Sequence, residues 1–201
     1  MLIGTHVRLE PLSHEHIAGL AAASAADPSL YTWSAVPQGT DDVAAYVDAA
    51  LALQNVGDTM AFATVRAGDG AIIGSTRFFN IERWAWPQGH ARQGRELIDG
   101  CEIGYSWLTR SAIRSAANTE AKFLMLRNAF ETWQVLRVCF HTDARNERSR
   151  RALARIGGRF EGILRAHRLA ADATARDSAR FSIVADEWPR VRDDLQQRLT
   201  V

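Results

Sequence analysis

The sequence has few cysteines and no long apolar run. Its 201 residues include only two cysteines, Cys101 and Cys139, each within an apolar, strand-like run. Two cysteines can form neither a disulfide framework nor a four-cysteine zinc site, so we expect two buried thiols and no bound metal. No apolar segment reaches the ~20 residues of a membrane span, and polar residues at 6–10 interrupt the start, where a secretory leader needs a continuous apolar stretch. We therefore expect a cytoplasmic protein without a membrane partner.

An excess of charge of one sign is also lacking, because the formal net charge is only +1. Near-neutrality, with no exposed aromatics interleaved among the basic residues of the predicted helices, argues against a nucleic-acid partner. The distribution along the chain is uneven, however. Residues 110–180 contain 15 Lys or Arg against 7 Asp or Glu, a net charge of +8, whereas the remainder carries −7. We expect the basic part to bind an anion.

The hydrophobic pattern predicts strands and helices without repeats and without a linker that would divide the chain. We therefore expect a single domain over residues 1–201. Alternating patterns predict strands at 6–10, 60–65, 72–79, 101–107, 136–142, 160–169 and 178–184. Apolar steps of three and four residues predict helices at 13–23, 40–56, 118–134, 146–156 and 188–199. The order is βααβββαβαββα, and residues 83–99 form an unusually long polar connection.

The connection before the helix at 118–134 has the character of an anion site. Unpaired N–H groups and the helix dipole make the start of such a helix a binding site for phosphate. Arg110 and Arg114 flank this connection, and the small residues 115–117 would let a pyrophosphate approach the backbone closely. The alternative is an ordinary tight turn between a strand and a helix.

Four stretches of sequence together carry a family resemblance. They are Gly4-Thr-His-Val-Arg-Leu-Glu-Pro-Leu, Glu102-Ile-Gly-Tyr-Ser-Trp-Leu, Asn118-Thr-Glu-Ala-Lys and Asn146-Glu-Arg-Ser-Arg-Arg-Ala-Leu-Ala-Arg-Ile-Gly. In order and spacing they resemble the Gcn5-related N-acetyltransferases, in particular the branch of the ribosomal-protein N-terminal acetyltransferases. The pyrophosphate loop of that family usually reads Arg/Gln-x-x-Gly-x-Gly/Ala. Here Ala116 and Asn118 occupy the glycine positions.

The resemblance implies an α/β (α+β) fold with a mixed, mostly antiparallel sheet of about seven strands, splayed between strands four and five and flanked by helices. It also implies transfer of an acetyl group from acetyl-CoA to a primary amine, a protein N-terminus or a small molecule, by direct attack. The implied acetyl-CoA-binding residues are Trp107, Leu108, Arg110, Arg114, Ser115, Ala116, Ala117, Asn118, Thr119, Asn146, Ser149 and Arg151. The altered loop leaves open a non-catalytic acyl-CoA-binding or sensor protein on the same fold.

Glu102 is the candidate for the general base that takes the proton of the amine. In the alternating strand 101–107 it is expected to share one face with Gly104 and Ser106, from which a carboxylate can reach a cleft. A solvated strand carboxylate without a chemical role is the alternative. The competing groups are Glu161, Asp177 and His167.

Ser149 is the candidate for the general acid that protonates the leaving thiolate. With Asn146 as the N-cap of its helix, Ser149 shares a face with Ala152, Leu153 and Ile156, so it should point inward. Members of the family often use a tyrosine on this helix, which has none here, and the resemblance to the ribosomal-protein branch suggests serine as its substitute. A second capping hydroxyl without chemistry is the alternative.

Residues that bind the acceptor amine are predicted partly in the polar loop 83–99. Trp84 and Trp86 are large apolar groups in this loop, so we expect them to line the acceptor cleft or a homodimer interface. The alternative is that they hold the loop together as a separate cluster. Tyr105 and His167 complete the predicted acceptor-binding set, and the identity of the amine stays open.

Overall fold

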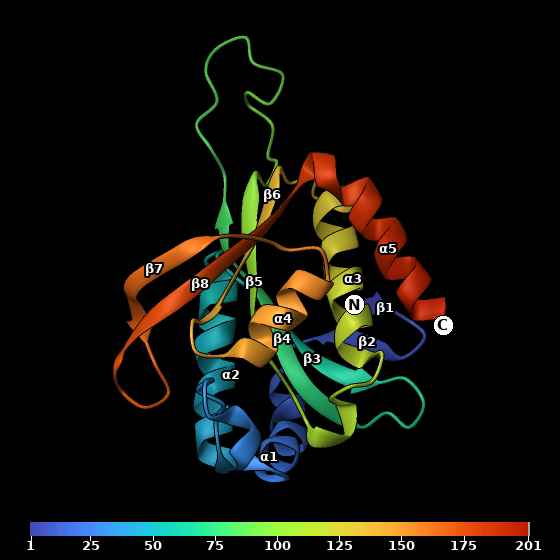
Figure 1. The fold of residues 1–201 in the computed structure, drawn as a ribbon, viewed down its shortest axis with the longest axis vertical. Coiled ribbons are helices and arrows are strands. Elements are labelled where there is room, and N and C mark those ends of the chain that lie inside the picture. Colours follow the sequence, from blue (N-terminus) through green and yellow to red (C-terminus); the bar gives the residue numbers. More distant parts are fainter. Residues whose placement is uncertain (201) are drawn as a thin grey trace.

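The protein, analysed as a computed structural model that describes residues 1–200, is built around one large sheet (Figure 1). Its strands are β1 (Leu2–Ile3), β2 (Val7–Pro11), β3 (Met60–Arg66), β4 (Ile72–Glu82), β5 (Gly100–Leu108), β6 (Arg137–Asp143), β7 (Arg159–Leu169) and β8 (Ala175–Val184). Its α-helices are α1 (Ile17–Ala25), α2 (Gly39–Asn55), α3 (Ala117–Arg127), α4 (Glu147–Arg155) and α5 (Trp188–Thr200). None of the helices in this described part is long and apolar enough to cross a lipid bilayer. The predicted order is confirmed, with β1 added in front.

The strands follow one another in the order β1-β2-β3-β4-β5-β6-β8-β7. Every neighbouring pair is antiparallel except β5 and β6, which run parallel. The predicted mixed, mostly antiparallel α/β sheet is therefore confirmed. The short β1 makes eight strands where about seven were expected, because two residues that pair with β2 carry no readable alternation.

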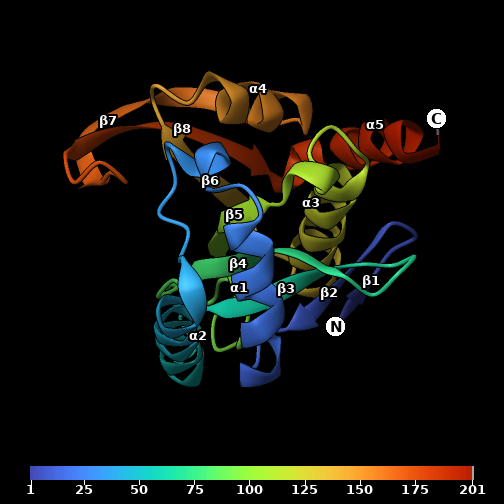
Figure 2. The same ribbon diagram turned by 90° about the horizontal axis from the view of Figure 1, so that it is seen from below.

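Helices cover both faces of this sheet (Figures 1 and 2). On one face α3 and α5 pack over a core that includes Phe62 and Phe78, whose rings meet edge-on at 6.1 Å. On the other face α1 and α2 pack over Ala61, Ala63 and Val65. Successive residues of β3 thus enter opposite cores, as the pleat of a strand requires. Small residues on one face let two helices approach closely, while the phenyl rings fill the other face.

The two halves of the sheet separate between β5 and β6. These strands pair only at their first residues, from Gly100 opposite Arg137 to Glu102 opposite Cys139. Beyond that point β5 stays paired with β4 up to Leu108, and β6 stays paired with β8 up to Asp143. Each strand therefore follows its other neighbour, and a wedge opens between them. The splay predicted between the fourth and fifth strands of the sequence is confirmed, since these are β5 and β6.

A β-bulge in β5 overturns one expectation about this strand. Ser75 pairs with Trp107 but Arg77 pairs with Gly104, so one residue of β4 faces two of β5, and Tyr105 takes a left-handed φ of +51°. An extra residue reverses the side-chain alternation beyond it. Ser106 therefore does not share a face with Glu102, as the alternation had predicted, but points to the side of α3, where it contacts Lys122.

One carboxylate joins two of the four stretches that carried the family resemblance. Glu120 of α3 is buried and accepts hydrogen bonds from the backbone N–H groups of Thr5, His6 and Val7 at 2.8, 2.6 and 2.7 Å. A side chain at Gly4 would start 2.4 Å from this carboxylate, so the close approach requires glycine. The contact fixes the first turn of α3 against the first strands, and the expected phosphate site lies in this same turn.

Candidate functional site

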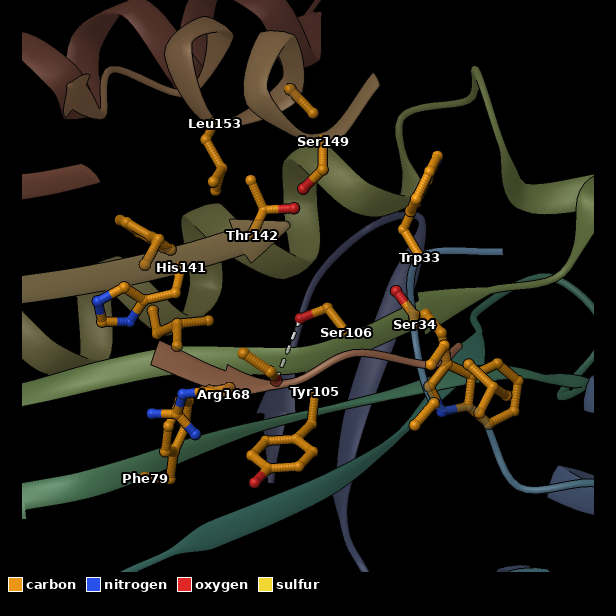
Figure 3. Close-up of a pocket in the computed structure, with 18 of the residues that line it drawn as sticks. Trp33, Ser34, Phe79, Tyr105, Ser106, His141, Thr142, Ser149, Leu153 and Arg168 are labelled. Carbon is orange, nitrogen blue, oxygen red and sulfur yellow. Dashed lines mark hydrogen bonds between the residues drawn. The ribbon is translucent and has the colours of Figure 1, made fainter. Parts of the chain in front are cut away.

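A cavity of about 310 Å³ occupies the wedge between β5 and β6 (Figure 3). Its walls come from the β5 bulge, the end of β6, the inner face of α4, the segment 33–36 and the end of β7. The ionisable side chains that line it are Tyr46, Tyr105, Lys122, His141, Arg168 and Arg176. Within the described chain no Asp or Glu lines it. The cavity is thus a basic chamber at the point where the sheet separates.

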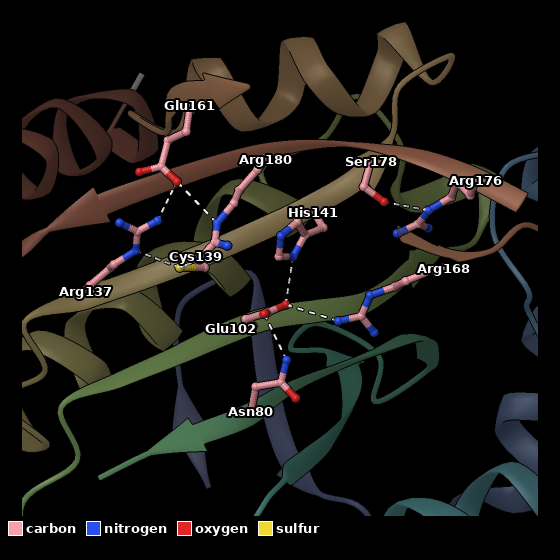
Figure 4. Close-up of polar contacts among 10 residues, drawn as sticks. All are labelled: Asn80, Glu102, Arg137, Cys139, His141, Glu161, Arg168, Arg176, Ser178 and Arg180. Atoms are coloured by element: carbon pink, nitrogen blue, oxygen red, sulfur yellow. Dashed lines mark hydrogen bonds and ion pairs between the residues drawn. The ribbon is translucent and has the colours of Figure 1, made fainter. Parts of the chain in front are cut away.

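Glu102 lies directly behind the cavity wall, in a polar cluster drawn in Figure 4. Its carboxylate oxygens lie 2.8 Å from His141 Nδ1 and 2.9 Å from the Asn80 amide nitrogen, which donates a hydrogen bond. Arg168 Nη2 is 3.6 Å away, close enough for an ion pair but too far for a hydrogen bond. His141 lines the cavity and Glu102 does not. The carboxylate predicted as the base is therefore separated from the chamber by the imidazole of His141, to which it is hydrogen-bonded.

The charge state of this pair follows from its surroundings. Burial by itself would raise the pKa of Glu102, but hydrogen bonds from His141 and Asn80 outweigh it and hold the pKa below its usual value. Because the carboxylate is ionised and can only accept, His141 Nδ1 carries a hydrogen and donates a hydrogen bond to Glu102. His141 Nε2 is buried and has no hydrogen-bond partner among residues 1–200. When the imidazole is neutral, this nitrogen has a free lone pair.

Ser149 and its helix face are placed as the periodicity predicted. Ser149, Ala152, Leu153 and Ile156 all line the cavity, and Figure 3 shows the Ser149 hydroxyl pointing toward Thr142. The hydroxyl itself makes no hydrogen bond within the described residues. The cap of α4 is made by the side chain of Asn146 and not by this hydroxyl. The inward orientation is confirmed, whereas the chemical role of Ser149 stays a prediction.

Lys122 is a polar group of the site that sequence reasoning did not select. It is the only lysine of the chain, is 5% exposed, and lines the cavity. Its Nζ donates hydrogen bonds to Ser106 Oγ at 2.5 Å and Thr76 Oγ1 at 3.2 Å, and no carboxylate pairs with it in residues 1–200. Burial lowers the pKa of Lys122 to about 7. Near neutral pH the cavity therefore holds an amine that exchanges between its charged and uncharged forms beside the β5 bulge.

The first turn of α3 has the features of the expected anion site. Its N-cap, Ala116, gives no side-chain hydrogen bond, and the N–H groups of Asn118 and Thr119 have no acceptor among residues 1–200. Ser115 Oγ accepts from Ala117 N–H at 3.2 Å, and Asn118 lines the cavity. Two free N–H groups at a helix start fit a phosphate. The departure from glycine thus leaves donors available at this helix end.

The other predicted cosubstrate residues divide into two groups. Trp107 is buried, lines the cavity and packs edge-on against Tyr31 at 5.8 Å, while the Leu108 carbonyl accepts a hydrogen bond from Tyr31 Oη at 3.3 Å. Among the exposed residues, Arg114 makes no hydrogen bond within residues 1–200, and Arg110 is paired with Asp27. Both therefore lie at the surface beside the first turn of α3.

On α4, the two predicted residues point away from the chamber or serve the helix. Asn146 Oδ1 accepts from the Ser149 N–H at 3.0 Å and so caps α4. Arg151 is exposed, and its Nε donates to the Glu147 carbonyl at 3.3 Å. Neither lines the cavity, so any contact they make with a ligand lies outside it.

The predicted acceptor residues are not gathered in one place. Tyr105 lines the cavity, and the His167 ring lies 4.8 Å from that of His141. Trp84 and Trp86 are in the loop after β4, which extends away from the body in Figure 1, and neither lines the cavity. Their rings lie 5.7 Å apart and Trp86 stacks on His90 at 4.0 Å. This arrangement matches the alternative of a separate cluster within the loop.

The competing carboxylates lie outside the chamber as well. Glu161 is held by Arg137 and accepts from Ser182 at 2.7 Å, and Asp177 accepts from the Ala166 N–H at 2.8 Å. Neither lines the cavity. The two cysteines are buried and free, as expected.

Residues 6–159 match the acetyltransferase (GNAT) domain. The chain belongs to the GNAT acetyltransferase family. A GCN5-related N-acetyltransferase from Brucella melitensis is 29% identical, with a TM-score of 0.83 over 98% of this chain and 84% of that one. A putative acetyltransferase from T. thermophilus is 31% identical, with a TM-score of 0.79 over 98% and 96% of the two chains.

The ribosomal-protein branch is represented among structures of the same fold. RimJ of Mycobacterium smegmatis, solved in complex with CoA-disulfide, is 23% identical with a TM-score of 0.78 over 96% of this chain and 88% of that one. No curated protein matches the chain. This GNAT protein is therefore an acetyltransferase by family. Its donor, acceptor and proton steps have to be inferred from the residues of its own cavity.

Proposed function

We propose that this GNAT protein is an acetyl-CoA-dependent N-acetyltransferase that transfers the acetyl group directly to a primary amine, with the whole chain acting as one catalytic domain. The observation that carries the proposal is the Glu102–His141 pair at the wall of the open wedge, with Ser149 of α4 lining the same cavity. A base and a hydroxyl that face one cavity can manage the two proton movements that amide formation needs.

The residues of the chain fit the cosubstrate. The free N–H groups of Asn118 and Thr119 would hold the pyrophosphate, with Arg110 and Arg114 adding positive charge at the same helix end. The unpaired edge of β5 up to Trp107 and Leu108 would hold the pantetheine arm, since β6 leaves that edge free. Acetyl-CoA supplies the activated thioester carbonyl.

We assign the proton steps to two side chains. His141 Nε2 accepts a proton from the ammonium group of the acceptor, which frees the nitrogen lone pair for attack, and the resulting imidazolium is stabilised by Glu102 on its other nitrogen. The carbon–nitrogen bond then forms and the carbon–sulfur bond breaks. Ser149 passes a proton to the departing sulfur and regains one from the nitrogen, which loses its second proton as the amide forms. No covalent bond to the enzyme is needed.

The test is a pair of substitutions at the base. Glu102→Gln and His141→Asn should each lower kcat by roughly 10²- to 10⁴-fold, the usual range for loss of a general base. Calorimetry should show unchanged affinity for CoA, because neither residue belongs to the proposed CoA contacts. Glu161→Gln is the matched control, since it removes an arginine-paired carboxylate that lies outside the cavity. Full activity of both base variants would contradict the assignment, and CoA binding without turnover by the unaltered protein would support the non-catalytic alternative.

A further inference from the structure

Two arginines lie side by side on the acceptor side of the cavity. Arg168 of β7 and Arg176 of β8 are directly opposite in the antiparallel register, and both line the chamber (Figure 4). Like charges directly opposite on neighbouring strands destabilise a sheet. A pair of this kind inside a cavity therefore has an unfavourable energy that a bound anion would offset.

The acids near this pair do not neutralise it. Arg176 has no ion pair among the described residues, and its Nε donates only to Ser178 Oγ at 3.0 Å. Arg168 reaches only Glu102, at 3.6 Å, and that carboxylate is already hydrogen-bonded to His141 and Asn80. The Nε of Arg168 is buried without a partner in residues 1–200. Hydrogen-bond donors of both arginines thus remain without a partner, on two residues that line the chamber.

A third guanidinium reinforces the positive field. Arg77 is 3% exposed and has no ion pair within residues 1–200. It lies between the rings of Tyr46 and Tyr105, at 4.6 and 4.0 Å from their centroids, and both tyrosines line the cavity. A buried, unpaired charge interacts strongly with the charge of a nearby ligand, because the dielectric constant between them is low.

The location separates this positive field from the proposed CoA phosphates. In Figure 1 the β7–β8 hairpin projects on the side opposite to α3 and α5, whereas the phosphates are assigned to the first turn of α3. The base, by contrast, is adjacent, because Glu102 contacts both His141 and Arg168. An anion held by the arginines and an amine held at His141 can therefore belong to one small molecule or one peptide end.

We propose that the acceptor is a primary amine that carries a carboxylate a few bonds from its nitrogen, and that Arg176, with Arg168, binds this carboxylate. The proposal rests on the N-acetyltransferase function proposed above. Two guanidinium forks match the planar, two-oxygen geometry of a carboxylate. A free amino acid and a peptide with an acidic first residue share this chemistry.

The experiment compares matched amines that differ only in charge. Acetyl-CoA turnover is measured with β-alanine and β-alaninamide, with glutamate and its diamide, and with peptides that begin with Glu or with Gln. We expect the carboxylate member of at least one pair to have a kcat/KM 10- to 100-fold higher than its amide. A preference within the amino acid pairs would identify a small acceptor, and a preference only within the peptide pair a peptide acceptor.

Variants then locate the preference. Arg176→Gln should raise the KM for the preferred acid at least 10-fold and reduce the acid-to-amide ratio toward one, with the KM for acetyl-CoA within twofold of that of the unaltered protein. Arg165→Ala, on the exposed side of the same strand as Arg168, should leave the ratio unchanged. Thermal melts show whether each variant is folded, and Arg176→Lys, which keeps the charge, should retain part of the preference.

Two outcomes would overturn the inference without touching the proposed function. Equal turnover of acids and amides, or a preference that survives Arg176→Gln, would show that the arginine pair does not select the acceptor. Absence of transfer to every amine in the set, with CoA still bound, would instead contradict the N-acetyltransferase function itself.

Discussion

Two buried charged residues, Lys122 and Glu120, lie two positions apart on α3 and have opposite surroundings. Glu120 receives three backbone N–H donors, which compensate a carboxylate for the loss of water. Lys122 meets only two hydroxyl groups, so its charged form is not compensated. Glu120 is a structural anchor, and Lys122 changes its protonation in the pH range where enzymes operate.

Lys122 should make stability depend on pH in a defined direction. Its pKa is about 7 in the folded protein, because it is buried, but about 10.4 in an unfolded chain. Between these values the unfolded state binds one more proton, so the free energy of unfolding gains up to ~1.4 kcal/mol per pH unit from this group as pH rises. Relative to Lys122→Met, the unaltered protein should therefore lose stability as pH falls from 10 to 7.

Urea unfolding of both proteins at pH 7, 8 and 9 measures this difference. Because the chain has one lysine, the isotope-labelled side chain also gives a single ε-methylene NMR signal, whose titration midpoint should lie near 7. Parallel stability curves for the two proteins, or a midpoint near 10, would contradict the assignment.

Glu120→Ala should destabilise the fold by about 2 kcal/mol or more. The substitution leaves three N–H groups of the first strand region without their acceptor, and each unsatisfied buried group costs ~1–3 kcal/mol, less where water can enter. Chemical denaturation at pH 7 measures the loss. Glu96→Ala, an exposed carboxylate in the loop after β4, should stay within about 0.5 kcal/mol, and an equal effect of the two substitutions would refute the anchoring role.

At the scale of the elements, α4 shows how much local sequence rules can predict. Its N-cap and its inward face follow from these rules, because a side-chain oxygen at Asn146 and apolar residues at three- and four-residue steps have one arrangement in a helix. The order of elements, the flanking helices and the position of Ser149 could be predicted in this way. The splay was predicted from family resemblance, not from periodicity.

Other features depend on single backbone angles or on distant contacts. The bulge at Tyr105 is one left-handed residue in an otherwise alternating strand, so the face of Ser106 was predicted wrongly. The predicted helix 118–134 ends early, since α3 stops at Arg127 and residues 128–132 form a π-helical turn that places Phe130 on Trp188. The sequence pattern does not show whether a lysine or histidine among apolar residues lies in the core or lines a cavity. Lys122 and His141 became candidates only when the fold brought them to the wedge.

The N-cap of α4 gives a prediction at this scale. Asn146→Ala should lower the free energy of unfolding by roughly 1 kcal/mol, within the ~0.5–2 kcal/mol typical of a lost cap. Asn146→Ser should recover most of it, because a serine oxygen can accept the same N–H. Denaturant titration of the three proteins tests this, together with CoA affinity by calorimetry. Lower CoA affinity at unchanged stability would instead place Asn146 in direct contact with the ligand.

At the scale of the whole molecule, the loop after β4 is the most prominent departure from a compact outline (Figure 1). It is tied at its base by Asp99, which is 2% exposed and accepts hydrogen bonds from Trp84 N–H, Trp86 Nε1 and Arg92 Nη1. The tryptophans thus organise the loop from within. Their predicted part in a homodimer interface stays a prediction.

Trp86→Ala should loosen this loop without destabilising the body. We expect faster trypsin cleavage after Arg92 and Arg95 and a melting temperature within a few degrees of the original, because the lost contacts lie inside the loop. Light scattering of both proteins provides the second readout. A change in particle mass would assign the loop to a subunit interface, and unchanged cleavage would show that Trp86 does not hold it.

The burial of the single lysine has a consequence for an enzyme that handles a reactive acyl donor. All other basic side chains of the Lys/Arg set are arginines, whose permanently protonated guanidinium groups are poor nucleophiles toward thioesters. The one ε-amino group is enclosed and donates to Ser106 and Thr76. The protein surface therefore presents no lysine that its own donor could acylate. Among the lysines, acylation by the donor is therefore confined to Lys122, which lines the cavity and whose lowered pKa leaves part of it as a free amine.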